Sequence, residues 1–502
     1  MNSKPGQIKV GELIEKYKKG EIGIPEFQRN YVWKNERILK LLDSIYKSYP
    51  IGALIIWTPP LGHIVQSKER QGSRPVQWLI DGQQRTKSLA NAIDDTNLIA
   101  FNPIIPEFRI MRKRRDRFIP IDQIFDDEKY PSVRENYKET YGNSPEIEKN
   151  FEACRKIKDF PLAMIEMDGH NYEDTIEAFK RVNTQGIRLR GDDIQSAEIS
   201  FKHTGFIKKK VQPTLKMLNN KGYDRIYSGH LFQACNFILK DNYRDKRTIF
   251  DKDISTEVLE RNWRKLEEGL KWMINILDTE LGIKNMTLVP SGPSLIPIAV
   301  LYSKLPATQR DVKKIIKWFI CTVVKRRYEK STDTTLIKDL EACLEHNPIE
   351  ALFRKGNISH NFALRPSSLD LSYNDRIAAI ILYIATIYNK GVDIFTRQKI
   401  KGNSRLNKHH IYPQKHFRNS SPEEKELINQ IGNITFLTTP VNQALKEELP
   451  ESYLQRVRKL NRNSVFIFDE PAELKLSKYK SFINKRKKLI CTSFNKFLSN
   501  EL

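Results

Sequence analysis

The sequence predicts an α+β protein with more than one domain. Its 502 residues exceed what one hydrophobic core usually serves. Strand-like apolar runs alternate with helical patterns up to about residue 200, and helical patterns then dominate to about residue 390. Strand and turn signals return after that. We therefore expect an α+β domain over 1–200, a helical domain over 201–395 and a small ββα-containing domain over 396–502.

The N-terminal segment combines helices with three strands. In "NERILKLLDSIYKSY", apolar residues follow Asn35, a residue type favoured at N-caps, and recur at helical spacing: Ile38, Leu41, Leu42 and Ile45. The runs "ALIIWT" (53–58), "VQWLI" (76–80) and "LAMIEMD" (162–168) predict strands. The second of these runs leads directly into "DGQQRTKSLANAI", a pattern typical of a turn followed by a helix.

The middle of the chain shows helical stripes and no sign of membrane insertion. In "VKKIIKWFICTVVKRRY" one face is apolar and the other basic, as expected for a core-facing helix. The most apolar run, "IAAIILYIATIY" from Ile377 to Tyr388, is too short to span a bilayer and predicts a core helix. The five cysteines lie far apart and are expected to be buried thiols in a reducing, cytoplasmic compartment.

The charge balance favours a polyanionic partner. Lys+Arg 85 against Asp+Glu 61 gives a net charge of +24, which suits phosphate neutralisation and makes nucleic acid the first candidate. Two basic runs fit such a contact: "RIMRKRRDR" (109–117) and "NKRKK" near the C-terminus. A lysine-rich, solvated surface would show the same composition.

The stretch "LIDGQQRTKSLANAI" predicts an anion site. A strand that stops at Asp81-Gly82 and re-enters a helix near Arg85 presents free backbone N–H groups at a helix N-terminus. Arg85 adds a cation, Gly82 allows close approach of a phosphate, and Gln83 and Gln84 could orient a water or a base. An Asp-Gly turn before a helix is also common structure without any ligand.

Two further stretches strengthen that prediction, "IPEFQRNYVW" and "FKRVNTQGIRL". In this order, the three stretches resemble the N-terminal domain of GmrSD-type restriction endonucleases, whose core is similar to the ParB/sulfiredoxin fold. The resemblance covers roughly residues 7–200 and implies binding and hydrolysis of a nucleoside triphosphate, with Asp81 and Arg85 catalytic. The nucleotide-binding residues that it implies are Gln28, Arg29, Asp81, Gly82, Gln83, Gln84, Arg85, Arg181 and Asn183. Replacing Arg85 by Ala is expected to abolish hydrolysis and leave the fold intact.

The stretch "RLNKHHIYPQKHF" (405–417) holds three of the nine histidines of the chain. "HHIYP" would end one strand, "IGNITFL" (431–437) predicts a second, and "TPVNQALKEEL" opens a helix with Pro440 in its first turn. A metal could lie between these elements. Taken singly, Asn433 is also typical of a turn and Asn442 of a capping residue. His409 and His410 should point to opposite faces of a regular strand, so both reach one ion only where the strand end is distorted.

Together these motifs resemble the H-x-x-P nuclease domain at the C-terminus of the same GmrSD family, a branch of the HNH superfamily with a ββα-metal fold. The resemblance covers roughly residues 400–490. It implies that His410 is the general base, that His409 and Asn442 are the metal-side pair, and that Asn433 supports the loop, while His416 is structural. Many HNH nucleases have Asp or Glu at the position of His409, so metal preference could move from Mg²⁺ toward Mn²⁺.

The sequence therefore predicts a nucleotide-regulated DNA endonuclease of restriction or phage defence. Its cofactors would be a divalent metal (Mg²⁺ or Mn²⁺) and a nucleoside triphosphate, and the resemblance implies modified phage DNA as substrate. No membrane partner is expected, and the chain could form a homo-oligomer. The alternative is a nucleotide-sensing DNA-binding regulator whose histidine domain cleaves nothing.

Overall fold

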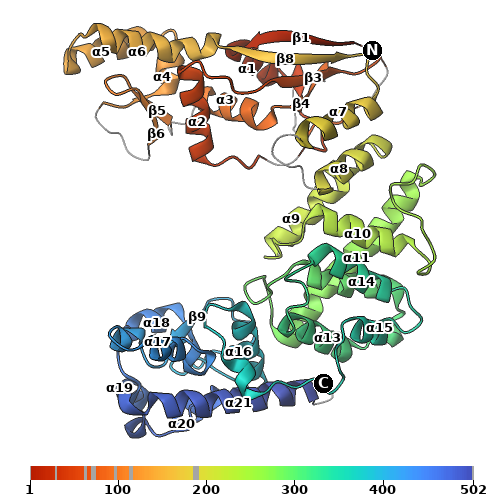
Figure 1. The fold of residues 1–502 in the computed structure, drawn as a ribbon, viewed down its shortest axis with the longest axis vertical. Coiled ribbons are helices and arrows are strands. Elements are labelled where there is room, and N and C mark those ends of the chain that lie inside the picture. Colours follow the sequence, from red (N-terminus) through yellow and green to blue (C-terminus); the bar gives the residue numbers. More distant parts are fainter. Residues whose placement is uncertain are drawn as a thin grey trace. The chain divides into compact units, whose positions relative to one another are not determined.

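The computed structural model describes residues 2–28, 31–61, 65–68, 75–94, 99–111, 117–184 and 191–499. The chain forms two compact units, Met1–Val211 and Gln212–Leu502 (Figure 1). A mixed sheet near the N-terminus, a mostly helical middle and a small sheet near the C-terminus confirm the α+β class. The three-domain division with ends at 200 and 395 stays a prediction.

The first unit is built on a five-stranded mixed sheet. Its strand order is β1-β8-β3-β4-β2. The strands are β1 (Asn2–Lys9), β2 (Ile22–Gly23), β3 (Leu54–Thr58), β4 (Gln77–Asp81) and β8 (Pro161–Asp168). β3 pairs parallel with β8 and antiparallel with β4, so the three strands predicted from the sequence form the centre of the sheet.

Sequence patterns missed the edge strand β1 and a smaller antiparallel sheet. β1 reads "NSKPGQIK", a polar run with Pro and Gly, which an edge strand tolerates because its outer N–H groups need no partner. The smaller sheet has the order β6-β5-β7 and consists of β5 (Ile99–Asn102), β6 (Glu107–Ile110) and β7 (Ile119–Pro120). Its strands are too short to show a period.

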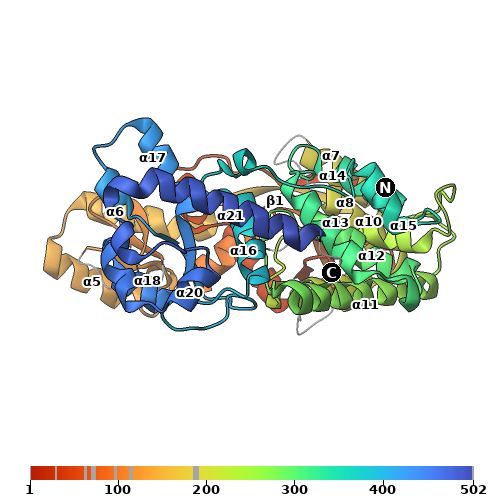
Figure 2. The same ribbon diagram turned by 90° about the horizontal axis from the view of Figure 1, so that it is seen from below.

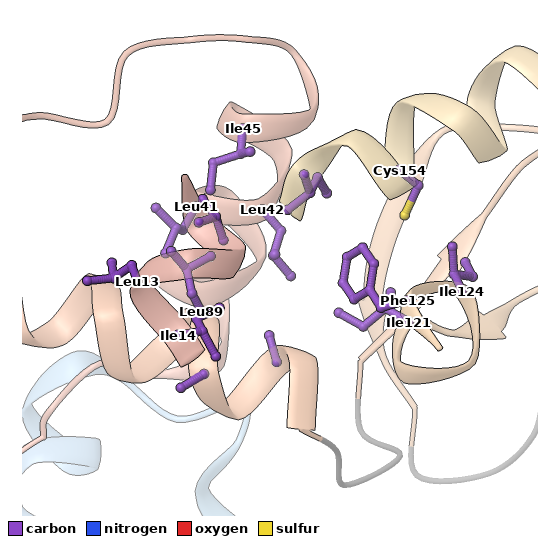
Figure 3. Close-up of a cluster of buried hydrophobic side chains, with 14 of the residues drawn as sticks. Leu13, Ile14, Leu41, Leu42, Ile45, Leu89, Ile121, Ile124, Phe125 and Cys154 are labelled. Carbon is purple, nitrogen blue, oxygen red and sulfur yellow. The ribbon is translucent and has the colours of Figure 1, made fainter. Parts of the chain in front are cut away.

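Helices of the first unit pack around two hydrophobic clusters, and Figure 3 shows part of the larger one, to which α7 and α8 do not contribute. The helices are α1 (Val10–Lys19), α2 (Asn35–Tyr46), α3 (Gln83–Asp94), α4 (Ile121–Phe125), α5 (Tyr130–Tyr141), α6 (Pro145–Arg155), α7 (Tyr172–Thr184) and α8 (Gly191–Lys202). The predicted stripe of α2 is confirmed, since Leu41, Leu42 and Ile45 are buried against α1 and α3. Cys154 from α6 is a buried free thiol of the larger cluster. The other four cysteines are also buried free thiols.

The second unit begins with helices and ends with the small sheet. Its longer helices are α9 (Gln212–Asn220), α10 (Ser228–Leu239), α11 (Thr256–Leu281), α12 (Ile296–Lys304), α13 (Val312–Val324), α14 (Thr332–Ala342), α15 (Pro348–Lys355), α16 (Arg376–Tyr388) and α21 (Tyr479–Ser499). α16 is the predicted core helix; residues 377–386 are buried, and it packs beside α21 (Figure 2). In the described part of the chain no helix is long and apolar enough to cross a membrane.

A two-stranded sheet and a helix follow α16. β9 (Leu406–His410) pairs antiparallel with β10 (Ile434–Thr438), and α18 (Thr439–Leu445) starts where β10 stops. The short helices around them are α17 (Pro422–Ile428), α19 (Pro450–Tyr453) and α20 (Lys459–Ser464). The strand, strand and helix that the sequence predicts are therefore present in that order.

The buried cation Arg486 holds this small sheet in place. Its side chain donates to the carbonyl groups of Gly432, Ile434 and Val465 at 2.9, 2.6 and 3.0 Å. Burial lowers the pKa of Arg486 to about 9. α21 also lies so close to the loop that a Cβ on Gly432 would meet the Ile483 carbonyl oxygen at 2.6 Å.

This anchoring changes the interpretation of the basic run "NKRKK", which belongs to α21. Arg486 is 1% exposed and Lys487 is 8% exposed. Lys487 pairs with Asp370, and Lys485 pairs with Asp469. Most of this predicted nucleic-acid contact is therefore structural, and it was wrong to treat the run as a free basic surface. Residues 112–116 of the other basic run lie outside the described residues.

Replacing Arg486 by Met should destabilise the second unit by at least about 3 kcal/mol. The substitution keeps a long apolar side chain but leaves several buried carbonyl groups without a hydrogen-bond donor. Each unpaired group lowers the free energy of unfolding by about 1–3 kcal/mol. Chemical denaturation followed by tryptophan fluorescence measures the loss. Lys488→Met, an exposed position on the same helix, is the matched control and should change stability little. Equal stability of the two variants would contradict the anchoring role.

Candidate functional site

The end of β9 brings His409 to the start of α18. In the antiparallel register His409 lies opposite Thr435 and His410 opposite Ile434. His409 Nδ1 lies 2.8 Å from Oδ1 of Asn442, a residue of α18. The pair predicted from the sequence is thus assembled by the strand–strand–helix arrangement itself.

His409 is almost fully enclosed, with 5% of its surface exposed. Its ring meets the ring of Tyr453 edge-on at a centroid distance of 6.0 Å. Burial lowers the pKa of His409, and the contact with Asn442 opposes that effect. The neutral imidazole, the form that can bind a metal, is therefore favoured.

The donor set of this pair suits a metal ion that accepts imidazole nitrogen. Adjacent ligands at about 2.1 Å from one ion are separated by about 3 Å, close to the 2.8 Å between His409 Nδ1 and Asn442 Oδ1. His409 Nε2 is buried and has no hydrogen-bond partner among the described residues. The structure, over its described residues, shows no group of three or more His, Cys, Asp or Glu placed around one ion. Two neutral donors fit Mn²⁺ better than Mg²⁺, which prefers carboxylate oxygen.

His410 faces a different environment. Its Nε2 lies 3.1 Å from Oδ1 of Asn429, and its ring meets Tyr373 edge-on at 4.6 Å. The amide of Asn429 is oriented by its own Nδ2, which donates to the Lys425 carbonyl at 2.8 Å. Asn429 therefore presents an acceptor to His410, so Nε2 carries the proton and Nδ1 keeps its lone pair. The structure brings His409 to Asn442 and gives His410 other partners.

Burial lowers the pKa of His410 to about 4, from an ordinary value of 6.5. His410 is consequently neutral at neutral pH and able to accept a proton. The same shift links stability to pH, because an unfolded chain binds a proton that the folded chain excludes. The contribution of His410 thus lowers the free energy of unfolding as the pH falls from about 6.5 to about 4.

Asn433 supports the loop that follows His410. Its Nδ2 donates to the carbonyl groups of Tyr412 and Ile428, both at 2.9 Å, and its Oδ1 accepts from the Tyr412 N–H at 2.8 Å. His416 lies apart from this loop: it is exposed, and its Nε2 donates to the Glu447 carbonyl at 3.1 Å. Both arrangements are structural contacts.

In the first unit, the D-G-Q-Q-R stretch joins β4 to α3. Gly82 adopts φ +100°, and a Cβ there would meet the Leu54 side chain at 2.2 Å. A glycine is therefore required at this turn whether or not a ligand approaches it. The predicted strand, turn and helix are confirmed at this point of the chain.

Arg85 is turned toward the protein. Its guanidinium donates to the Ile51 and Ala53 carbonyl groups, both at 2.8 Å, and to Asp81 at 2.7 Å. Only 14% of its side chain is exposed. Because these contacts hold the segment before β3 against β4, we now expect Arg85→Ala to destabilise the fold, in contrast to the expectation from the sequence.

The glutamines of the predicted site also bridge segments. Gln28 Nε2 donates to the Ile80 carbonyl at 2.7 Å, and Gln84 Oε1 accepts from the Val32 N–H at 2.9 Å. Gln83 is buried, with 3% exposed. Gln28, Asp81, Gln84 and Arg85 thus all lie around the end of β4, and their role in binding a nucleotide stays a prediction.

Of the other predicted nucleotide-site residues, only the side chain of Arg181 is among the described residues. Arg181 lies on α7 with 78% of its side chain exposed and pairs with Glu177 of the same helix. Asn183 belongs to α7, but its side chain lies outside the described residues, as does Arg29. Sequence patterns also missed Asn429 and Tyr373, which surround His410, because neither belongs to a motif.

Comparison with known proteins assigns both ends of the chain to one family. Residues 10–200 match the family model of the GmrSD restriction endonuclease N-terminal domain, and residues 361–492 match that of the C-terminal domain of GmrSD restriction endonucleases. The chain belongs to the GmrSD restriction endonuclease family. Membership of this family implies a nuclease with DNA as its substrate, and a nuclease domain suggests a metal ion.

Similarity to one relative extends along most of the chain. An uncharacterized protein from Methanocaldococcus jannaschii is 22% identical over an alignment 526 positions long, which covers 91% of this chain and 88% of that protein. The helical middle between the two GmrSD matches is therefore shared with at least one relative of similar length.

We expect Arg85→Ala to lower the free energy of unfolding of the first unit of this GmrSD-family chain by about 3 kcal/mol, since it removes a buried charged donor from several acceptors. Arg85→Lys should be destabilised as well, because lysine lacks the fork that reaches both carbonyl groups. Thermal and denaturant unfolding measure this. Arg109→Ala, an exposed arginine paired with Glu107, is the control. Wild-type stability in Arg85→Ala would refute the bridging role.

Proposed function

We propose that this chain is a nucleotide-regulated, metal-dependent DNA endonuclease of a restriction or phage-defence system, and that modified DNA is its substrate. The observation that carries the proposal is the 2.8 Å approach of His409 and Asn442 where β9 meets α18, with a neutral histidine next in sequence. Family membership supports the nuclease part independently.

In this structure His409 Nδ1–H donates to Asn442 Oδ1. A metal held by His409 and Asn442 would replace that proton between Nδ1 and Oδ1, and it would stabilise charge on the scissile phosphate when bound. His410 would accept the proton of the attacking water at Nδ1, because Asn429 already fixes the proton of its ring on Nε2. His409 and His410 are neighbours on a strand and point to opposite faces. This role therefore requires the end of β9 to bring both side chains to one phosphate. Asn433 would keep the adjoining loop in register.

The first unit would bind and hydrolyse a nucleoside triphosphate. The network around β4 and the N-terminus of α3 supports this, since Asp81 ends β4, Gln84 lies in the first turn of α3, and a helix N-terminus favours an anion. Asp81 would serve catalysis, Gly82 and Gln83 would bind phosphate, and Arg85 would act mainly by holding the site together. We propose that hydrolysis in this unit controls cleavage in the other. The ParB/sulfiredoxin-like fold of the unit is part of this proposal.

A second candidate is a nucleotide-sensing DNA-binding regulator without nuclease activity. The different partners of His409 and His410 favour it. Incubating the full chain with plasmid and with hydroxymethylated, glucosylated, phosphorothioated or unmodified DNA separates the two, with and without Mn²⁺, Mg²⁺ and nucleotide. Binding without any cleavage across the panel would favour the regulator.

His410→Ala should lose cleavage almost completely, because a general base contributes about a hundredfold to ten-thousandfold in rate. His409→Ala and Asn442→Ala should act through metal affinity. Raising the Mn²⁺ concentration should therefore partly restore these two variants and leave His410→Ala inactive. Single-turnover cleavage against metal concentration measures the difference.

His416→Ala is the matched control, since this exposed histidine only contacts a carbonyl group. It should cleave at the wild-type rate. Wild-type cleavage by His410→Ala, or inactivity confined to His416→Ala, would exclude the proposed assignment.

A further inference from the structure

The second unit contains a cavity that is lined by neither His409 nor His410. Its volume is about 450 Å³, within the range of about 300–1,000 Å³ typical of small-ligand pockets. The loop after α11, the start of α16, the strands β9 and β10 and the segment before β9 all contribute to its wall. All of these segments belong to one compact unit.

The wall of the cavity is basic. Four cationic residues line it: Arg225, Lys284, Arg376 and Lys408. None of the lining residues that the structure describes is Asp or Glu. Asp375, which adjoins the wall in sequence, is paired with Arg326 and does not line the cavity. A site with this charge excludes cations and selects an anion.

Two of these cations have no ion-pair partner within the described parts of the chain. Lys284 and Arg376 are both exposed, and neither is paired with a carboxylate there. Lys408 is held by the Tyr373 carbonyl and lies 5.3 Å from the centroid of the Tyr373 ring. Arg225 donates to the Val289 carbonyl at 2.9 Å. The cavity thus has two cations fixed by the protein and two available to a ligand.

Amide side chains complete the wall: Asn285, Asn374, Asn403 and Asn407. Each amide can donate and accept hydrogen bonds, as the edge of a nucleobase or a sugar hydroxyl requires. The aromatic residues Phe436 and Tyr383 form an apolar part of the wall. Cations, amides and aromatic rings together match a phosphorylated nucleotide better than a simple inorganic anion.

The cavity adjoins the nuclease site through β9. Leu406, Asn407 and Lys408 line it, and Lys408 shares one face of the strand with His410, which is two residues further along. Tyr373 touches both, because its ring lies against His410 at 4.6 Å and against the Lys408 ammonium. A nucleotide in the cavity would therefore lie near the proposed base His410, which is two residues along β9 from Lys408.

We infer that this cavity binds a nucleotide of the DNA strand that is cut, with its phosphate on Lys284 and Arg376 and its base or sugar against the asparagine side chains. The inference rests on the proposed nuclease function, because it assigns the cavity to the substrate of that site. A free nucleotide has the same chemistry, so the experiment includes both sources.

The test measures DNA affinity in EDTA, where no cleavage occurs, so that its outcome does not depend on the nuclease chemistry. The full chain is titrated into a fluorescein-labelled oligonucleotide at several salt concentrations. Lys284→Gln/Arg376→Gln should bind about tenfold more weakly for each lost phosphate contact near 0.1 M salt, and the slope of log K against log salt should fall by about 2. Competition with ATP, GTP and deoxynucleoside monophosphates forms the second arm.

The control is Lys313→Gln/Lys330→Gln, which removes the same charge from exposed positions of the same unit. Its salt slope should match the wild type. Equal affinities and slopes for the two double variants would overturn the inference. Loss of ATP or GTP binding in Lys284→Gln/Arg376→Gln with unchanged DNA affinity would also overturn it, in favour of a free-nucleotide site. Loss of DNA affinity in this variant would stand even if His410→Ala showed that the nuclease assignment is wrong.

Discussion

The contact between the Arg486 guanidinium and the backbone carbonyl groups around β10 is the constraint on which the C-terminal site depends. A cation with 1% exposure is costly to bury when none of the described carboxylates pairs with it, and carbonyl groups from Gly432, Ile434 and Val465 offset that cost. These contacts hold β10 beneath α21. β9 then pairs with β10 in a single register, which puts His409 opposite Thr435.

The nuclease site follows from that register. A shift of one residue would turn His409 away from α18 and bring Lys408 to its place. Asn433 adds a second restraint, since it holds the loop after His410 through Tyr412 and Ile428. The site therefore depends on residues that never touch a substrate, and much of the sequence motif around "IGNITF" describes this support. The same holds in the first unit, where Gly82 and Arg85 of the D-G-Q-Q-R stretch mainly join β3, β4 and α3.

How much the sequence could predict varies with the kind of residue. The central strands β3, β4 and β8, the stripe of α2 and the core helix α16 follow from apolar periodicity, which burial enforces locally. Motif resemblance predicted the approach of His409 to Asn442, because the spacing of strand, strand and helix leaves few alternatives. β1 could not be predicted, since a polar edge strand is stabilised by pairing with a segment more than 150 residues away. The partners of His410 and Arg486 could not be predicted either, because such contacts join distant segments without a local pattern. For the same reason "NKRKK" reads as a basic surface although it contains a core anchor.

The central claim is that the His409–Asn442 pair holds the metal of a nuclease site. Crystals of the full chain soaked in Mn²⁺ and measured at the manganese absorption edge test it most directly. We predict an anomalous peak within coordination distance of both His409 Nδ1 and Asn442 Oδ1. Crystals of Asn442→Ala treated in the same way should show no peak there. A peak elsewhere in the second unit, or an unchanged peak in the Asn442→Ala crystals, would contradict the account.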